Sequence, residues 1–196
     1  MAAARRAKPA HARDGRVLPR AFFVTDPVRT PDALATMNRL PRGMGVIWRH
    51  FGESTRLATG LALARACRRR GLVLLVANDP ALANRIGAAG VHWPERQLRA
   101  VRPRWPGMIE TAAAHSRAAI TRACARGVDA VLLSAVFPSR SPSAGPPLGP
   151  IRFNGLCRAA PLPVYALGGI GAENAGHVMA HAAGWAAIDA VRDAWG

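Results

Sequence analysis

Residues 72–92 read LVLLVANDPALANRIGAAGVH and contain the unit that decides the fold. Leu72–Ala77 is an unbroken apolar run, which is typical of a parallel strand that is covered on both faces. Asp79 can cap a helix that Pro80 opens, because aspartate accepts from free helix amides and proline fits the first helical turn. A second apolar run, Gly90–His92, follows that helix. The stretch therefore predicts a strand, a helix and a further strand in succession.

The same alternation extends along the chain in both directions. Ser54 and Ser116 are predicted helix caps, Thr30 precedes Pro31 in the same manner, and Gly71 ends the helix that Ser54 begins. The predicted strands are Ala21–Thr25, Gly43–Trp48, Leu72–Ala77, Gly90–His92, Ile109–Ala113, Ala130–Ser134, Val164–Leu167 and Trp185–Ile188.

Eight such strands with helices between them predict a compact (β/α)₈ TIM barrel. Little chain follows Trp185–Ile188, so the eighth helix must be short, completed by a partner, or missing. An open, doubly wound sheet is the structural alternative.

Composition bounds the class of protein. The chain has 196 residues, enough for roughly one domain, and 27 basic against 11 acidic residues give a net charge of +16. All basic residues but Lys8 are arginines, they are scattered, and aromatic residues make up only 6%. We therefore expect a solvated basic surface rather than a nucleic-acid site, with polyanion binding through the N-terminus as the alternative.

The first twenty residues differ from the rest, with six basic residues, one acid and no apolar periodicity. This pattern predicts a disordered basic tail over residues 1–20 and a barrel domain over 21–196. An arginine-rich start is also typical of a mitochondrial transit peptide.

No stretch has the length of a membrane span or of a secretory h-region. The three cysteines are dispersed along the chain, which suits reduced thiols. We therefore expect a cytoplasmic protein without a membrane partner.

Function in a TIM barrel gathers where the strands end at their carboxyl side. Gly168 and Gly169 follow the seventh run and precede a helix that we expect to begin at about residues 172–174. This pattern suits phosphate binding, although a glycine pair can also simply turn the chain. The long loop over residues 137–149 carries Ser139 and Arg140 and suits a lid over an anionic ligand, or else a flexible surface loop.

Polar side chains also follow the third, fourth and fifth runs. Asp79 and Glu95 could hold a hard cation, while the alternative for Asp79 is helix capping alone. His92 and His115 suit general acid or base chemistry, or a packed structural role.

These motifs, taken in order, resemble the thiamine phosphate synthase and TenI-type family of small (β/α)₈ barrels. The resemblance covers Ala21 to Val191 and is most specific in VFPS…GPPLG and ALGGI…ENA. The motifs are FFVTD (22–26), VIWR (46–49), VAND (76–79), GVHWPE (90–95), AAHS (113–116), SAVFPSRSPSAGPPLG (134–149), PVYALGGIGAENA (163–175) and GWAAIDAV (184–191).

The resemblance implies a transferase that joins a hydroxymethylpyrimidine diphosphate to a thiazole phosphate, with Mg²⁺ neutralising the diphosphate leaving group. Small phosphorylated pyrimidine and thiazole substrates would then be its partners, and a homo-oligomer is possible. The implied catalytic residues are Arg49, Asn78, His115 and Arg140; the implied substrate-binding residues are Ser116, Ser139, Gly168, Gly169 and Asp189; the implied metal ligands are Asp79 and Glu95.

The chain also departs from the family pattern. The loop offers Arg140 where the family has a lysine, and Asp189 stands where a serine helps to bind phosphate, a like-charge contact that costs roughly 1 to 4 kcal/mol. A catalytically degenerate barrel, which binds a phosphorylated ligand or a partner without turnover, is therefore the alternative function. The remaining departures are Ile47 for a glutamine, Phe51 for a lysine, Gln97 for a metal carboxylate and Ala135 for the histidine of the tautomerase branch.

Overall fold

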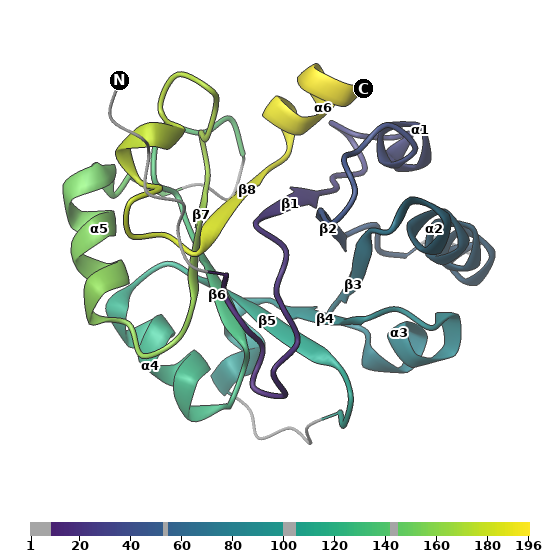
Figure 1. The fold of residues 1–196 in the computed structure, drawn as a ribbon, viewed down its shortest axis with the longest axis horizontal. Helices are drawn as coiled ribbons and strands as arrows, with labels where there is room; N and C mark the ends of the chain where they lie inside the picture. Colours follow the sequence, from purple (N-terminus) through teal and green to yellow (C-terminus); the bar gives the residue numbers. More distant parts are fainter. Residues whose placement is uncertain (1–8, 53–54, 100–104, 142–144) are drawn as a thin grey trace.

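Eight parallel strands close into one barrel in the order β1 to β8 (Figure 1). A computed structural model of the chain describes residues 9–52, 55–99, 105–141 and 145–196. The closed order confirms the predicted TIM barrel and excludes the open sheet. The strands are β1 Ala21–Val24, β2 Gly45–Trp48, β3 Val73–Ala77, β4 Gly90–Trp93, β5 Ile109–Ala114, β6 Ala130–Leu133, β7 Val164–Leu167 and β8 Gly184–Ala187.

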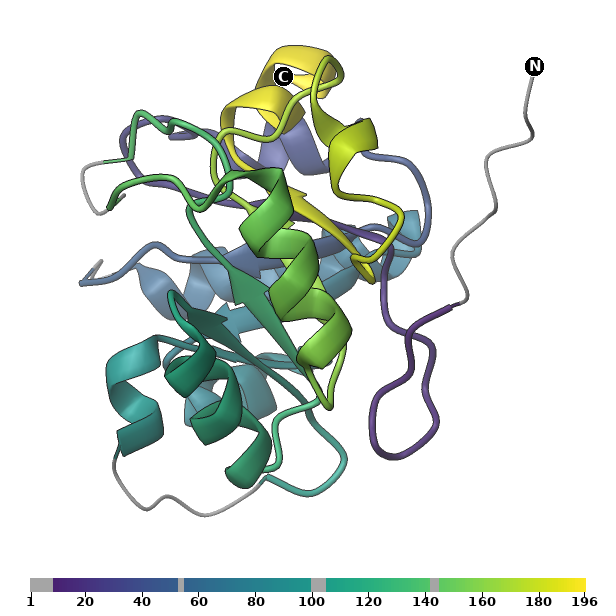
Figure 2. The same cartoon turned by 90° about the vertical axis from the view of Figure 1, so that its left-hand side faces the viewer.

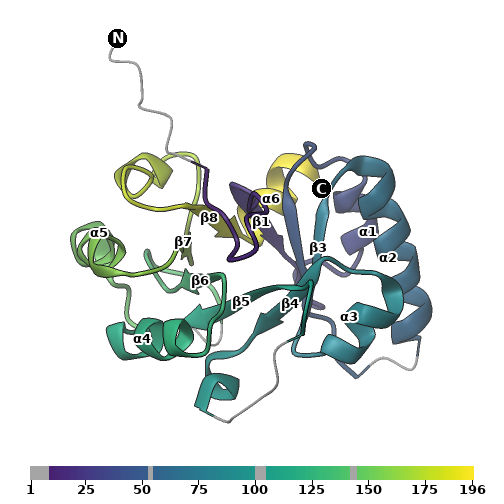
Figure 3. The same ribbon diagram turned by 60° about the horizontal axis from the view of Figure 1, so that its bottom comes forward.

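Helices surround the barrel, with α1 to α3 beside β2 to β4 and with α4 and α5 beside β5 to β7 (Figure 3). The last helix has seven residues and confirms the predicted short eighth helix. The helices are α1 Ala33–Met37, α2 Arg56–Arg70, α3 Pro80–Ile86, α4 Arg117–Ala125, α5 Gly149–Ala159 and α6 Asp189–Trp195, with 3₁₀ helices η1 Glu95–Arg99 and η2 Ala175–His177.

Most of the predicted helix ends are confirmed. The Asp79 carboxylate accepts from the amide of Leu82 at 2.9 Å, and Gly71 ends α2 in the left-handed conformation. The prediction for Thr30 is wrong, because its hydroxyl instead donates to the carbonyl of Asp26 while Asp32 caps α1. The predicted cap Ser54 lies outside the described residues.

The interior of the barrel is closed at the amino-terminal ends of the strands by residues 9–20. A bridge joins His11 to Val17 in a hairpin, and Leu18, 1% exposed, packs into the apolar cluster that fills the barrel. The hydroxyl of Tyr165 donates to the carbonyl of Pro19 at 2.7 Å and fixes the hairpin to β7. Figure 2 shows this segment in purple, well apart from α6 in yellow.

The hairpin shows that the predicted disorder is wrong for residues 9–20. The other part of that prediction, residues 1–8, lies outside the described residues. Within the described part of the chain, no helix is both long enough and apolar enough to cross a membrane.

Candidate functional site

A cavity of about 780 Å³ opens at the carboxyl ends of the strands, where the loops after β1 to β8 meet. Nine of the eleven predicted site residues line it, and Asp79 and Ser116 do not. The nine are Arg49, Asn78, Glu95, His115, Ser139, Arg140, Gly168, Gly169 and Asp189.

Asp79 and Ser116 serve helix ends instead of the cavity. The Ser116 hydroxyl accepts from the amide of Ala119 at 3.2 Å at the start of α4. Asp79 caps α3 and also binds the Arg56 guanidinium at 2.9 Å, which stacks over the Trp48 ring at 5.3 Å. Asp79 therefore has its carboxylate oxygens committed to a helix end and an arginine.

Glu95 is held just as firmly. Its Oε2 accepts from the backbone amide of His115 at 3.0 Å and lies 2.7 Å from the Nδ1 of the same residue. Its Oε1 accepts from Nη2 of Arg122 in α4 at 2.8 Å. The carboxylate is thus bonded to one imidazole and one guanidinium.

These contacts bear on the Mg²⁺ site that the family resemblance implies. A hard cation needs carboxylate oxygens that are not already bonded to other cations. Asp79 and Glu95 are each bonded to an arginine, and Gln97 offers no charge at the remaining expected position. Across the described ranges, no group of three His, Cys, Asp or Glu side chains could hold a metal ion. The residues present therefore do not fit that site.

Asp189 faces the cavity but is surrounded by cations. Its carboxylate oxygens lie 3.3 Å from Arg29, 3.4 Å from Arg192 and 3.6 Å from Arg140. Arg29 also contacts Asp26 at 3.3 Å, which joins the loop after β1 to the start of α6. The repulsion that the sequence predicts between Asp189 and a phosphate is therefore reduced by three neighbouring guanidiniums.

The glycine pair after β7 allows two loops to approach each other. Gly168 and Gly169 have φ values of 92° and 63°, which side chains rarely adopt. A Cβ at Gly168 would lie 2.8 Å from the Cβ of Ala135, and one at Gly169 would lie 2.3 Å from the carbonyl oxygen of Pro138. The predicted start of a helix at about residues 172–174 is followed only by the three-residue 3₁₀ helix η2, so the expected α-helix is wrong. Any phosphate here would depend on backbone amides and arginines.

His92 lies on the wall of the cavity and is almost fully buried. Its Nδ1 is hydrogen-bonded to the Thr111 hydroxyl at 3.0 Å. Burial, aided by the nearby charge of Arg49, lowers the pKa of His92 to about 3. His92 is therefore neutral near pH 7 and suits hydrogen bonding to a ligand rather than proton donation.

Sequence patterns did not identify three arginines that hold the rim carboxylates. Arg29 follows the first strand in TDPVRT and lines the cavity, whereas Arg56 and Arg122 lie on helices. The position of Arg29 directly after a predicted strand could have identified it. Arg56 and Arg122 had no such signal, because their ion pairs join residues 23 and 27 positions apart and leave no local pattern.

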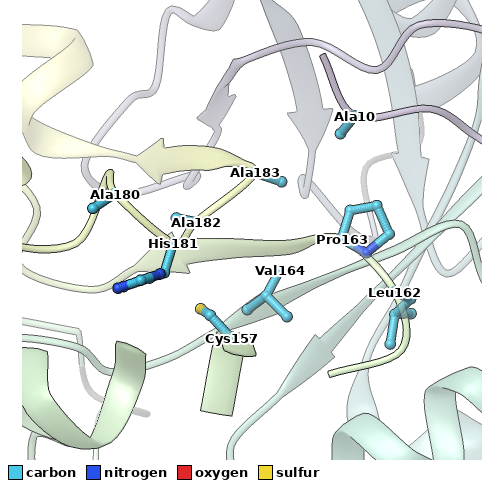
Figure 4. A pocket seen from close by; sticks show the side chains of 9 residues that line it. All are labelled: Ala10, Cys157, Leu162, Pro163, Val164, Ala180, His181, Ala182 and Ala183. Atoms are coloured by element: carbon cyan, nitrogen blue, oxygen red, sulfur yellow. The ribbon is translucent and has the colours of Figure 1, made fainter. Parts of the chain in front are cut away.

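A smaller cavity of about 290 Å³ lies between the hairpin, α5 and the β7–β8 connection (Figure 4). Cys157 and His181 face it among apolar side chains. Burial raises the pKa of the Cys157 thiol to about 12, so this cysteine is not a nucleophile near neutral pH.

Comparison with known proteins identifies the family. Residues 23–191 match the family model described as thiamine monophosphate synthase. The thiamine-phosphate synthase of Methanoculleus marisnigri is 35% identical over 142 residues, which is 69% of this chain and 66% of that protein. The thiamine biosynthesis bifunctional protein ThiED of Geobacter sulfurreducens is 34% identical over 132 residues, so that the match covers 65% of this chain and only 26% of that longer protein.

A solved structure supports the same fold. The thiamine phosphate pyrophosphorylase of Pyrococcus furiosus superposes with a TM-score of 0.72 at 22% identity, covering 89% of this chain and 91% of that one. With a family match over most of its length, the chain belongs to the thiamine monophosphate synthase family.

Proposed function

We propose that this protein joins a hydroxymethylpyrimidine diphosphate to a thiazole phosphate and releases diphosphate. In the reaction, the thiazole ring nitrogen forms a bond to the pyrimidine methylene carbon as the bond from that carbon to the diphosphate oxygen breaks. The observation that carries the proposal is that the family's rim motifs meet around one cavity whose lining includes Arg29, Arg49, Arg96 and Arg140.

Positive charge in a partly enclosed cavity suits this chemistry, because negative charge develops on the departing diphosphate. Four carboxylates also line the cavity, but Glu95, Asp189 and Asp193 are each bonded to arginines. The negative charge of these three is therefore compensated before a substrate enters, while the fourth, Glu173, accepts a hydrogen bond from Asn174.

We assign the diphosphate to the side of the cavity formed after β2 and β3. Arg49 projects from the end of β2, and its amide donates to the Thr25 hydroxyl at 2.9 Å, which fixes its backbone. Burial lowers the pKa of the Arg49 guanidinium while Asp26 opposes this effect. Asn78 follows β3 and adds an amide that can donate to a phosphate oxygen.

We assign the thiazole phosphate to the opposite side, after β6 to β8. The backbone of Gly168 and Gly169 lines the cavity, and Ser139 and Arg140 line it from the loop after β6. Phosphate oxygens accept hydrogen bonds from amides, hydroxyls and guanidiniums alike.

The test is formation of thiamine phosphate from both substrates by the purified chain, followed by liquid chromatography. We expect product with the wild type, a loss of about 10²-fold or more in kcat for Arg49→Ala, and no loss for Arg65→Ala on the exposed side of α2. No product above background at high protein concentration would overturn the proposal.

Binding without turnover is the second candidate function. Phe51 lines the cavity where the family has a lysine, and it offers an apolar surface to a ligand instead of a charge. Calorimetry with thiazole phosphate and thiamine phosphate separates the two functions, because a pure binding protein shows heat of binding but no product.

We also propose a cytoplasmic location. The three cysteines are free thiols in the structure, as expected in a reducing compartment. A homo-oligomer stays a prediction that light scattering would test.

A further inference from the structure

Phe51 presents an apolar ring to the main cavity. Four large hydrophobic side chains among the described residues are more than half exposed, namely Val17, Val28, Phe51 and Ile151. Phe51 is the aromatic member of this set and the one that lines the cavity. A single exposed apolar side chain on an outer surface is ordinary, whereas an exposed aromatic ring on a cavity wall offers a ligand a flat face.

The guanidinium of Arg56 covers part of the Phe51 ring and supports it. It lies over the Phe51 ring, 5.5 Å from its centroid, and over the buried Trp48 ring, 5.3 Å from that centroid. Such a contact is attractive because the face of an aromatic ring carries negative charge. The Nη1 of Arg56 also donates to the Asp79 carboxylate at 2.9 Å, which fixes the guanidinium. The Phe51 ring is therefore held in place by contacts with β2, α2 and the start of α3.

The remainder of the ring is open to a ligand. Phe51 is 54% exposed and lines the cavity, whereas Arg56 does not line it. A ligand in the cavity therefore meets the part of the ring that Arg56 leaves uncovered. Strands β2 and β3 are neighbours in register, with Trp48 opposite Val76, so the residues that follow them lie side by side. Phe51 thus belongs to the same side of the cavity as Arg49 and Asn78.

The pyrimidine diphosphate of the proposed reaction carries both groups that this wall can bind. Its ring is flat and aromatic, and heteroaromatic rings of this kind stack on aromatic side chains. A single methylene joins the ring to the diphosphate, which we assign to Arg49. Arg49 precedes Phe51 by two residues, a separation that spans no more than about 7 Å of backbone. A ring that stacks on Phe51 therefore leaves its diphosphate within reach of Arg49.

The residue type at position 51 decides which part of this substrate it favours. A lysine offers a point charge to the diphosphate, whereas phenylalanine offers apolar area and a π face to the ring. We propose that Phe51 is the specificity-determining residue for the pyrimidine, and that its uncovered face stacks on the ring while Arg49 binds the diphosphate. This inference rests on the proposed function, which supplies the identity of the substrate.

The experiment measures the binding of two probes by isothermal titration calorimetry, hydroxymethylpyrimidine diphosphate and inorganic diphosphate, in the absence of thiazole phosphate. Phe51→Leu keeps an apolar side chain but removes the ring. We expect it to raise Kd for the pyrimidine diphosphate about fivefold or more, as loss of a stacked base does, and to change Kd for inorganic diphosphate less than about twofold. Phe51→Tyr keeps the ring and should bind both probes as the wild type does. Phe51→Lys should bind the inorganic diphosphate more tightly than the wild type.

A control and a spectroscopic readout distinguish stacking from a structural role. Ile151→Ala removes an exposed apolar side chain from α5, outside the cavity lining, and should leave both Kd values unchanged. In proton NMR, the signals of hydroxymethylpyrimidine should move upfield on binding to the wild type and to Phe51→Tyr, because an aromatic ring shields protons above its face. Phe51→Leu should lose this shift, with circular dichroism checking the fold of each variant.

The outcomes separate this inference from the function on which it rests. A wild type that binds the pyrimidine diphosphate through Phe51 but makes no thiamine phosphate overturns the proposed reaction and leaves the stacking role standing. A wild type that makes product while Phe51→Leu keeps its Kd, or loses affinity equally for inorganic diphosphate, overturns the stacking role and leaves the proposed function standing. A wild type that does not bind the pyrimidine diphosphate overturns both.

Discussion

Replacing Asp189 with asparagine should tighten the binding of a phosphate monoester in the cavity. The side chain keeps its shape and an oxygen acceptor but loses its negative charge. Arg29, Arg140 and Arg192, all within 3.6 Å of Asp189, would remain and would gain one unit of net positive charge as a group. A phosphate bound near Gly168 would meet that charge across the cavity.

The size of the effect follows from Coulomb's law. At roughly 5 Å and an effective dielectric between about 20 and 80, one unit of charge is worth about 1 to 3 kcal/mol. The dissociation constant for thiazole phosphate should therefore fall roughly 5- to 150-fold. The three lost contacts are partly exposed, so the free energy of unfolding should fall by no more than about 2 kcal/mol.

Isothermal titration calorimetry at two salt concentrations measures this effect. The gain should shrink between about 0.05 M and 0.5 M salt, because screening shortens the reach of the added charge. Asp14→Asn, which removes the same charge from the exposed hairpin at the far end of the barrel, should change the affinity little. Unchanged or weaker phosphate binding by Asp189→Asn would refute the electrostatic reasoning and would show that Asp189 orders the arginines for the ligand.

Three further predictions concern stability. Leu18→Ala should lower the free energy of unfolding by about 2 to 5 kcal/mol in urea titrations, against less than about 0.5 kcal/mol for Val17→Ala, and equal losses would contradict a hairpin that closes the barrel. Asp79→Ala should cost about 1 to 2 kcal/mol by removing a helix cap and the partner of Arg56, and a gain in stability would contradict the capping role. The folded pKa of His92 is about 3 against 6.5 in the unfolded chain, so the unfolded state binds more protons and stability falls as pH drops from 6.5 toward 3, by at most about 1.4 kcal/mol per pH unit. His92→Asn should flatten this slope between pH 6.5 and 5, and an unchanged slope would argue against a buried neutral His92.

The barrel was predictable because its strands carry a strong local signal. Runs such as Leu72–Ala77 are apolar throughout, since parallel strands in a barrel are covered on both faces. Asp79 and Gly71 marked helix ends for reasons that lie within a few residues of each. The hairpin over residues 9–20 was missed because Ala12 and Leu18 are isolated among arginines, and only the open end of the barrel makes their burial favourable.

The composition of the site was more predictable than the roles within it. TIM-barrel geometry brings the ends of all strands to one rim, so Arg49, Asn78 and His115 were found from their place after apolar runs. Whether the carboxylates of Asp79 and Glu95 are free or paired depends on Arg56 and Arg122, which lie on helices elsewhere in the chain. No local sequence pattern contains that information.

The excess of arginine has a structural use that differs from nucleic-acid binding. The proposed phosphorylated substrates would bind less tightly for every free carboxylate on the cavity wall, because like charges at contact distance cost free energy. Here an arginine stands against the cavity carboxylates Glu95 and Asp189 and against Asp79 at the start of α3, which reduces the negative potential near the cavity. The same pairing occupies those carboxylates, so in the proposed reaction the negative charge of the substrates would be neutralised by guanidiniums. The arginine content and the poor fit to a metal site are therefore two consequences of one arrangement of charge.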